Sequence, residues 1–266
     1  MMQQDILSRL SRDYPWKDRI QYFPALGSTN DLLKALARQG APHGTAVVAG
    51  HQTAGHGRLG RSFHSPEGMG IYLSILLRPD CRPLDLMHLT CAAAVAMCDA
   101  VEAAAGFRPG IKWTNDLVYR RKKLGGILTE LGLTPTGMVD YAIIGIGINC
   151  RQQETDFPAD LRSMAASLNM VTGTDTAPAA LAAAMLESLA RMDTRLLTEK
   201  AAILDAYRAV CVTLGQEISV VRGDDLRHGT ALSIDEEGAL VVRYGDGVTE
   251  AVRSGEVSIR GMYGYI

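Results

Sequence analysis

The strongest constraint on how this chain folds is a glycine-rich segment at residues 50–61, GHQTAGHGRLGR. A strand-like run at 45–49 leads into it, and a second at 70–77 follows with no helical stretch between them. Closely spaced glycines let a backbone bend sharply and approach a bound molecule, because no Cβ stands in the way. Arg58 and Arg61 add two planar, permanently charged groups that suit a carboxylate or a phosphate. The segment therefore predicts an anion-binding loop between two strands, which makes the chain a candidate for nucleotide chemistry.

The loop formally matches a dinucleotide-binding fingerprint, but its context excludes that interpretation. Gly55, Gly57 and Gly60 have the required spacing, and Asp80 supplies an acidic residue further along the chain. The fingerprint must open a helix, whereas residues 61–68 form a turn that runs into the next strand. The Gly-Lys-Ser/Thr of a P-loop is also absent. A plain surface loop is the simpler alternative, yet two arginines and a glutamine in one loop favour a ligand clamp.

Two lysine-containing clusters offer further charge. In the block KWTND at 112–116, an anchored β-turn is the simpler interpretation, since Asn-Asp is typical of turns and Trp of cores. The functional alternative makes Lys112 a phosphate contact and Asp116 a Mg²⁺ ligand or an orienting group. Lys122 and Lys123 precede a pair of glycines at 125–126. Lysines at a strand start are usually only solvated, but the glycines allow a close approach to the strand. Lys123 is therefore a candidate for stabilising a carboxylate or phosphate.

A third cluster, GIGIN at 145–149, closes an apolar run. Glycines weaken a strand unless a ligand or another backbone packs on them. Asn149 offers both a donor and an acceptor to a base or a ribose. Three histidines at 51, 56 and 64 lack the ligand spacing of a zinc site. No Gly-x-Ser-x-Gly motif is present, so the sequence does not support a serine hydrolase of that type.

Two domains are expected, at residues 1–213 and 214–266. The first alternates strands and helices, which predicts an α/β arrangement with a mixed sheet. From residue 217 onward the chain has short β-like pieces separated by turn signals such as YGDG at 244–247, which predicts a small appended barrel. The expected elements of the first domain are strands at 20–23, 45–49, 70–77, 110–120, 123–131 and 139–148, and helices at 28–39, 83–105 and 178–210. Ser28 is expected to cap the first of these helices, and Gly40 to end it.

Net charge, the N-terminal sequence and the cysteines indicate which partners and which compartment the protein has. The net charge is −2 with scattered lysines and arginines, which argues against nucleic acid as the main partner. The N-terminus lacks the pattern of a signal peptide, and we expect no apolar stretch to be long enough to span a bilayer. Five cysteines without a CxxC pair indicate reduced thiols, as in the cytoplasm.

Taken together, these motifs resemble the biotin–protein ligases, or biotin–[acetyl-CoA-carboxylase] ligases. The resemblance covers nearly the whole chain and rests on motifs in a fixed order. They are STN at 28–30, Gln52 with the glycine loop, KWTND at 112–116, KLGGIL at 123–128, GIGIN at 145–149 and GEVSIR at 255–260. The resemblance implies an α+β catalytic domain with a mixed sheet, followed by an SH3-like small β-barrel. Because 19 residues precede the first expected strand, the monofunctional form without an N-terminal DNA-binding domain is expected.

The resemblance also implies a two-step reaction and a set of residue roles. Biotin and Mg·ATP give biotinyl-5′-AMP, and the biotin then passes to a lysine of a carrier protein, such as the biotin carboxyl carrier subunit of acetyl-CoA carboxylase. Catalytic roles fall to Lys123, Arg58 and Arg61. Biotin contacts fall to Ser28, Thr29, Asn30, Gln52, Gly55, His56, Gly57, Arg58, Lys123, Gly126, Gly145 and Gly147. ATP contacts fall to Arg58, Arg61, Phe63, Lys112, Asn115, Asp116, Lys123, Asn149 and Arg260.

Three positions depart from the pattern of the family. His56 stands where the loop usually has an arginine, Phe63 where tryptophan is common, and Thr114 where proline is frequent. A lipoate or octanoate ligase or transferase is the enzyme alternative, although its Arg-Arg-x-Ser-Gly-Gly-Gly pattern is absent. A non-catalytic biotin-binding protein is the other alternative, and Lys123 with the arginine pair argues against it. A monomer and a homodimer both remain open, and neither DNA nor a membrane is expected as a partner.

Overall fold

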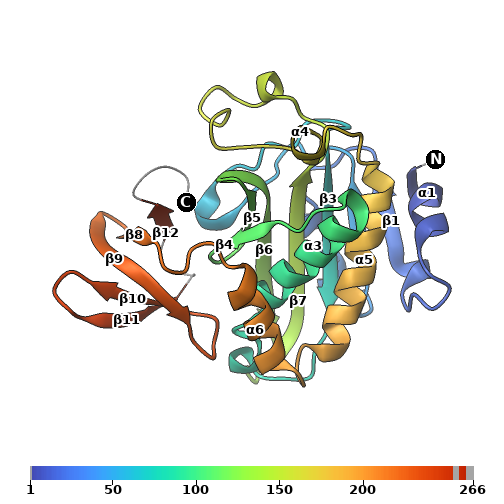
Figure 1. Ribbon diagram of the computed structural model, residues 1–266. Coiled ribbons are helices and arrows are strands. Elements are labelled where there is room, and N and C mark those ends of the chain that lie inside the picture. Colours follow the sequence, from blue (N-terminus) through green and yellow to red (C-terminus); the bar gives the residue numbers. More distant parts are fainter. Residues whose placement is uncertain (1, 254–257, 262–266) are drawn as a thin grey trace.

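The larger part of the protein is a seven-stranded mixed sheet with helices on both faces (Figure 1). The computed structural model describes residues 2–253 and 258–261. The strand order is β1-β2-β3-β7-β6-β5-β4, in which β1 and β2 are parallel and the other neighbours antiparallel. The strands are β1 Ile20–Phe23, β2 Ala46–Ala49, β3 Gly70–Leu77, β4 Gly110–Lys112, β5 Asp116–Tyr119, β6 Lys122–Leu133 and β7 Val139–Asn149.

Apolar helix faces enclose the sheet and fix its position. The helices are α1 Met2–Arg9, α2 Thr29–Arg38, α3 Leu89–Ala105, α4 Leu168–Thr172, α5 Pro178–Arg195 and α6 Lys200–Val210. Helices α3 and α5 pack on each other across one face of the sheet, where the main hydrophobic core lies (Figure 1). A smaller cluster joins Leu33 and Ala37 of α2 to Leu76 of β3 and Ile143 of β7. The expected α+β class with a mixed sheet is therefore confirmed.

The start of α2 follows from local sequence. Ser28 is extended and its Oγ accepts a hydrogen bond from the backbone N–H of Asp31, which satisfies one donor of the first helical turn. Gly40, with φ +87°, follows the C-terminal end in the left-handed conformation that glycine favours. The predicted cap and stop are both confirmed, and they place Thr29 and Asn30 at the first turn of α2.

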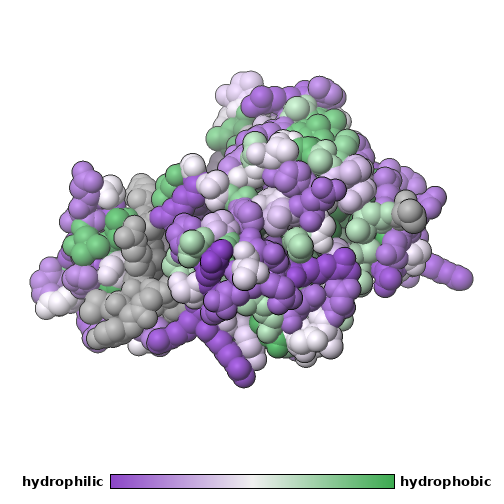
Figure 2. All heavy atoms as spheres, turned by 90° about the horizontal axis from the view of Figure 1, so that it is seen from above, coloured by the Kyte–Doolittle hydropathy of each residue, from purple (hydrophilic) through white to green (hydrophobic). Residues whose placement is uncertain are grey.

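Two long helices expected from the sequence are divided in the structure. Residues 83–105 form a short 3-10 turn, Pro83–Leu86, and then α3. The region 178–210 is likewise two helices, α5 and α6. By length and composition alone, Pro83–Ala105 could cross a membrane, contrary to the expectation, but 67% of its apolar window is buried in the protein. It is the core helix of the larger domain, and the face shown in Figure 2 is mostly hydrophilic with hydrophobic residues in small groups.

The C-terminal part is a five-stranded antiparallel sheet ordered β11-β10-β9-β8-β12. Its strands are β8 Glu217–Arg222, β9 Asp225–Ile234, β10 Leu240–Tyr244, β11 Thr249–Val252 and β12 Ser258–Gly261. Within the described strands, no pairing joins β11 to β12, so the expected barrel is an open sheet here. The turn after β9 docks on the larger domain, because Trp113 Nε1 donates to the Gly238 carbonyl at 3.0 Å. A division between residues 213 and 214 stays a prediction.

Candidate active site

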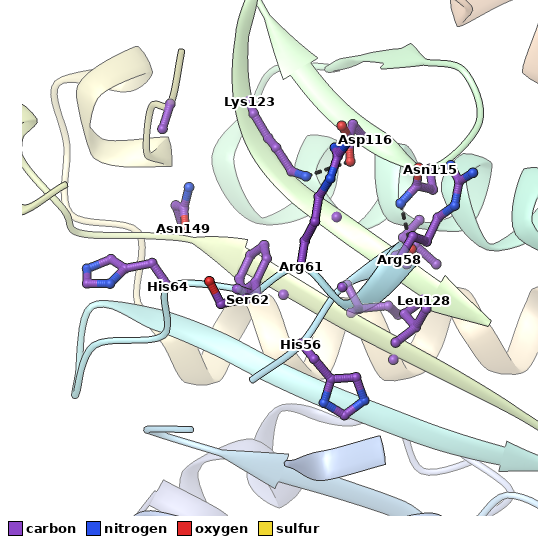
Figure 3. A pocket seen from close by; sticks show the side chains of 18 of the residues that line it. His56, Arg58, Arg61, Ser62, His64, Asn115, Asp116, Lys123, Leu128 and Asn149 are labelled. Carbon is purple, nitrogen blue, oxygen red and sulfur yellow. Dashed lines mark hydrogen bonds and ion pairs between the residues drawn. The ribbon is translucent and has the colours of Figure 1, made fainter. Parts of the chain in front are cut away.

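A cavity of about 330 Å³ opens beside the ends of β6 and β7, beneath the glycine-rich loop (Figure 3). Its lining residues come from six segments that are distant in the sequence. They are Ser28, Thr29, Asn30, Gln52, His56, Gly57, Arg58, Leu59, Arg61, Ser62, Phe63, His64, Lys112, Trp113, Asn115, Asp116, Lys123, Gly126, Ile127, Leu128, Gly145, Ile146, Gly147, Asn149, Phe157, Leu161, Met164 and Ala165. A concave site with apolar walls and a few convergent polar groups is typical of a small-molecule pocket.

One end of the cavity is neutral and its polar groups are held by the protein. Gln52 Oε1 accepts hydrogen bonds from Thr29 N at 2.8 Å and from Thr29 Oγ1 at 3.0 Å. The amide nitrogen of Gln52 lies 3.4 Å from Ser65 Oγ. Ser28, Thr29 and Asn30 are all buried. This end can therefore offer oriented hydrogen bonds to an uncharged polar ring.

The other end is charged. Lys123 Nζ lies 2.7 Å from Asp116 Oδ1, and Arg58 Nη1 donates to Asn115 Oδ1 at 2.9 Å (Figure 3). Asn115 in turn donates from Nδ2 to the Ile127 carbonyl at 2.8 Å, which fixes its orientation. Lys112 is buried and also lines this end. Burial lowers the pKa of Arg58, while the nearby Asp116 acts in the opposite direction. The result is a group of cations, held in place by the protein, at the wall of one cavity.

The glycine-rich loop folds back on itself as a tight hairpin over this cavity. The Phe63 amide donates to the Gly55 carbonyl at 2.9 Å, and a short 3-10 turn occupies Arg58–Gly60. A Cβ on Gly55 would lie 2.8 Å from Ser65 Oγ and 2.9 Å from Gln52 Nε2. Gly55 therefore does not line the cavity but allows the hairpin to pack behind Gln52.

At Gly126, Gly145 and Gly147 the space next to the strand is taken by side chains of the protein, whereas at Gly125 the nearest atom is the Gly147 carbonyl oxygen. A Cβ on Gly145 would lie 2.7 Å from Cγ of Asn30, and one on Gly147 would lie 2.5 Å from Cε1 of Phe63. At Gly126 the neighbours are Lys123 Nζ at 3.2 Å and Cε at 3.3 Å. The prediction that these glycines permit a close approach is confirmed for Asn30, Phe63 and Lys123. Contact with a ligand there stays a prediction.

Asn149 is more constrained than the sequence suggested. Its Nδ2 donates to the Ala166 carbonyl at 3.0 Å, and its Oδ1 accepts from Gln152 Nε2 at 3.1 Å. Both ends of the amide thus bind the segment that follows β7. Lys123 N donates to the Met164 carbonyl at 2.7 Å, which brings the same segment to the cavity. Asn149 lines the cavity while it orders one of its walls.

The residues that were predicted to bind biotin or ATP line this one cavity, except Gly55 and Arg260. Arg260 lies in strand β12, and its side chain falls outside what the structure describes. The wall made by Phe157, Leu161, Met164 and Ala165 was missed. These residues follow no periodic pattern, and hydrogen bonds from Lys123 and Asn149 to residues 164–166 place them.

Magnesium has one protein carboxylate available at this cavity. Asp116 is the acidic residue among the described lining residues, and no group of three metal-ligating side chains occurs in the described part of the chain. The zinc interpretation of the three histidines therefore finds no support there. One carboxylate fits Mg²⁺ that is held mainly by substrate phosphates and water.

Comparison with known proteins gives the class. Residues 22–149 match the biotin/lipoate A/B protein ligase family, and residues 213–260 match the biotin protein ligase C terminal domain. The solved structure of the biotin protein ligase from Aquifex aeolicus in complex with biotin and ATP superposes with a TM-score of 0.77 at 28% identity, covering 91% of this chain and 99% of that one.

Two relatives narrow this class. The bifunctional ligase/repressor BirA of Bacillus subtilis (strain 168) is 37% identical over 228 residues, which is 85% of this chain and 70% of that protein. The biotin--[acetyl-CoA-carboxylase] ligase of Mycobacterium tuberculosis is 32% identical over 238 residues, or 87% and 85% of the two chains. The chain therefore belongs to the biotin protein ligase family.

Proposed function

We propose that the protein is an ATP-dependent biotin–protein ligase and that the two ends of the cavity bind different parts of its substrates. The enzyme joins the biotin carboxylate to the α-phosphate of ATP, giving biotinyl-5′-AMP and releasing pyrophosphate. The amine of an acceptor lysine then attacks the mixed anhydride, forms the amide and releases AMP. The neutral end holds the ureido ring of biotin, and the charged end holds the reacting carboxylate and phosphate.

One observation carries this proposal: a neutral hydrogen-bonding end and a cationic end share one cavity. Thr29 and Gln52 present hydrogen-bond donors and acceptors to a ring that bears no charge. Lys123 and Arg58 stand where two anions would meet and repel each other. Fixed cations at developing negative charge are the largest expected contribution to such a reaction. Arg61 and Lys112 line the same end and add to this charge.

The glycine hairpin protects the intermediate. A mixed anhydride is hydrolysed by water, so the site gains from a loop that covers it. Gly57 and its neighbours line the cavity, and the Gly57 N–H holds the hairpin closed by donating to the Arg61 carbonyl at 2.6 Å. His56 replaces the usual arginine in this hairpin. Phe63 and Asn149 frame the adenine. Asp116 would hold Mg²⁺ together with the ATP phosphates, and the ion would supply positive charge to the triphosphate.

The acceptor and the setting are inferred from the family. The acceptor is a lysine of a biotin carboxyl carrier subunit, and the enzyme acts in the cytoplasm as a monomer or a homodimer. Arg260 is assigned to the ATP phosphates. These assignments rest on the resemblance of the motifs.

The test is incubation with labelled biotin, Mg·ATP and an apo carrier domain. Label on the carrier is expected, together with release of pyrophosphate before the carrier is added. Transfer of lipoate in place of biotin would favour the lipoate alternative. Tight biotin binding without pyrophosphate release would instead show a binding protein, and the proposed reaction would be wrong.

A further inference from the structure

We infer that Glu130 and Ser74, which do not line the cavity, orient the hydroxyl of Thr29 so that it accepts a hydrogen bond from the ligand. This inference rests on the proposed function, since it concerns the end of the cavity that would hold the biotin ring. It makes both residues positioning residues for substrate recognition. The relay runs from Glu130 through Asn30 and Ser74 to Thr29.

The orientation of Asn30 is set by a carboxylate. Asn30 Nδ2 lies 2.8 Å from Glu130 Oε2, and the other carboxylate oxygen of Glu130 lies 2.9 Å from Lys34 Nζ. An ionised carboxylate only accepts hydrogen bonds, so it requires the NH₂ group of Asn30 and not its oxygen. The Asn30 side chain cannot move aside on the strand side, because it fills the space over Gly145. Its oxygen is therefore fixed on the opposite side, facing Ser74.

Ser74 transmits this orientation. Its Oγ lies 2.6 Å from Asn30 Oδ1 and 2.7 Å from Thr29 Oγ1, and the side chain is fully buried. A hydroxyl has one hydrogen and two lone pairs. Because Asn30 Oδ1 can only accept, it takes the Ser74 hydrogen. Ser74 then faces Thr29 with a lone pair.

The Thr29 hydrogen is consequently used inside the protein. Its two acceptors are Ser74 Oγ at 2.7 Å and Gln52 Oε1 at 3.0 Å. Whichever takes the hydrogen, the side of Thr29 Oγ1 that faces the cavity carries a lone pair. Thr29 is 4% exposed, so no bulk solvent competes to reorient it.

The chemical consequence is selectivity for a ring with an N–H group. A cyclic urea such as biotin brings a donor to Thr29, whereas a dithiolane such as lipoate brings none and leaves the buried oxygen unpaired. A site that hydrogen-bonds a substrate group discriminates strongly against analogues that lack it. Through the relay, residues outside the cavity thus allow the site to distinguish biotin from lipoate, the substrates of two related enzyme classes.

A double-mutant cycle on biotin affinity tests the relay, with isothermal titration calorimetry of the full chain. Ser74→Ala should weaken biotin binding about five- to tenfold, the size of one ordinary hydrogen bond. In a Thr29→Val background the same change should alter the affinity by less than about twofold, because Ser74 acts through Thr29. Glu130→Gln should give a smaller loss than Ser74→Ala. ATP affinity should stay unchanged in all of these variants.

Ser188→Ala is the matched control, since Ser188 is a buried serine on α5 outside the cavity lining and accepts a bond from Arg191. It should leave biotin affinity unchanged. Equal losses from Ser74→Ala in both backgrounds would overturn the relay, as would unchanged affinity in Ser74→Ala and Glu130→Gln. If the wild-type chain bound no biotin, the proposed function would fail and the relay with it. The variant of Glu130, which is partly exposed, keeps the test valid should Ser74→Ala unfold.

Discussion

The two ends of the cavity are organised on opposite principles. At the neutral end, Thr29, Gln52 and Asn30 are buried or half-buried and their polar atoms bond to one another and to residues behind them. At the charged end, Lys123 and Arg58 bond to Asp116 and Asn115, which also line the cavity. The polar groups of the neutral end are thus oriented by residues outside the cavity. The cations of the charged end are paired with residues inside the cavity, and a bound phosphate would have to compete with those residues.

This difference predicts that substitutions at the two ends will have different effects. A buried hydrogen-bond network is sensitive to added volume and to a lost partner, because interiors are close-packed. A half-exposed ion pair contributes little to stability but much to a reaction that gathers negative charge. Substitutions at the neutral end should therefore change biotin affinity, and those at the charged end should change the rate.

The largest effect is expected for Lys123→Ala. Loss of one fixed charge-stabilising group at a reaction centre lowers the rate by about 100- to 1000-fold. The free energy of unfolding should fall by about 1 kcal/mol or less, since the ion pair with Asp116 is partly exposed. Pyrophosphate release under saturating biotin and ATP measures the first quantity, and urea titration the second. The neighbouring variant Lys122→Ala is the control and should be near wild type. Normal turnover in Lys123→Ala would remove this assignment, and Lys122 would then be the candidate.

A pair of glycine substitutions contrasts the two ends directly. Gly145→Ala should displace Asn30, whose Cγ would lie 2.7 Å from the new Cβ, and weaken biotin binding about 10- to 100-fold, since overpacking costs about 1–3 kcal/mol. Gly126→Ala meets the flexible end of Lys123, at 3.2 Å from Nζ, and Asp116 Oδ1 at 3.4 Å, and should change biotin affinity less. Calorimetric titration of both variants with biotin measures the two losses of affinity. A greater loss in Gly126→Ala would reverse the comparison.

Much of this contrast could be predicted from the sequence, and some could not. The cap at Ser28, the strand glycines and the cationic loop are local signals, and each lies where the pattern placed it. The wall at 157–165 and the relay through Ser74 are not local. Ser74 sits in a continuous apolar run on β3, where only the register against β2 and β7 shows what it faces. The open C-terminal sheet likewise depends on pairing rather than on strand propensity.

A third prediction concerns how the C-terminal sheet supports the charged end. Trp113→Phe keeps an aromatic side chain, although a smaller one, but removes the donor to Gly238, at 3.0 Å, and should lower the free energy of unfolding by about 1–3 kcal/mol. The ATP KM should rise about two- to fivefold, because residue 113 directly precedes the segment that carries Asn115 and Asp116. Biotin affinity should stay unchanged. A selective loss of biotin binding would show that Trp113 serves the other end.

The smallest effect is expected from salt. Screening weakens interactions between exposed charges when the Debye length falls from about 10 Å at 0.1 M to about 3 Å at 1 M. ATP affinity should therefore fall a fewfold over that range, while biotin affinity stays nearly constant. Titrations of each ligand alone at both salt concentrations provide the measurement. Equal salt dependence for the two ligands would mean that the ends are not electrostatically distinct.

The most direct test of the account is a crystal structure of this chain with biotinyl-5′-AMP. The ureido ring should bond to Thr29 and Gln52, and the phosphate should lie against Lys123 and Arg58 beneath the glycine hairpin. An adenylate bound away from this cavity, with the hairpin directed into solvent, would contradict the assignment of both ends.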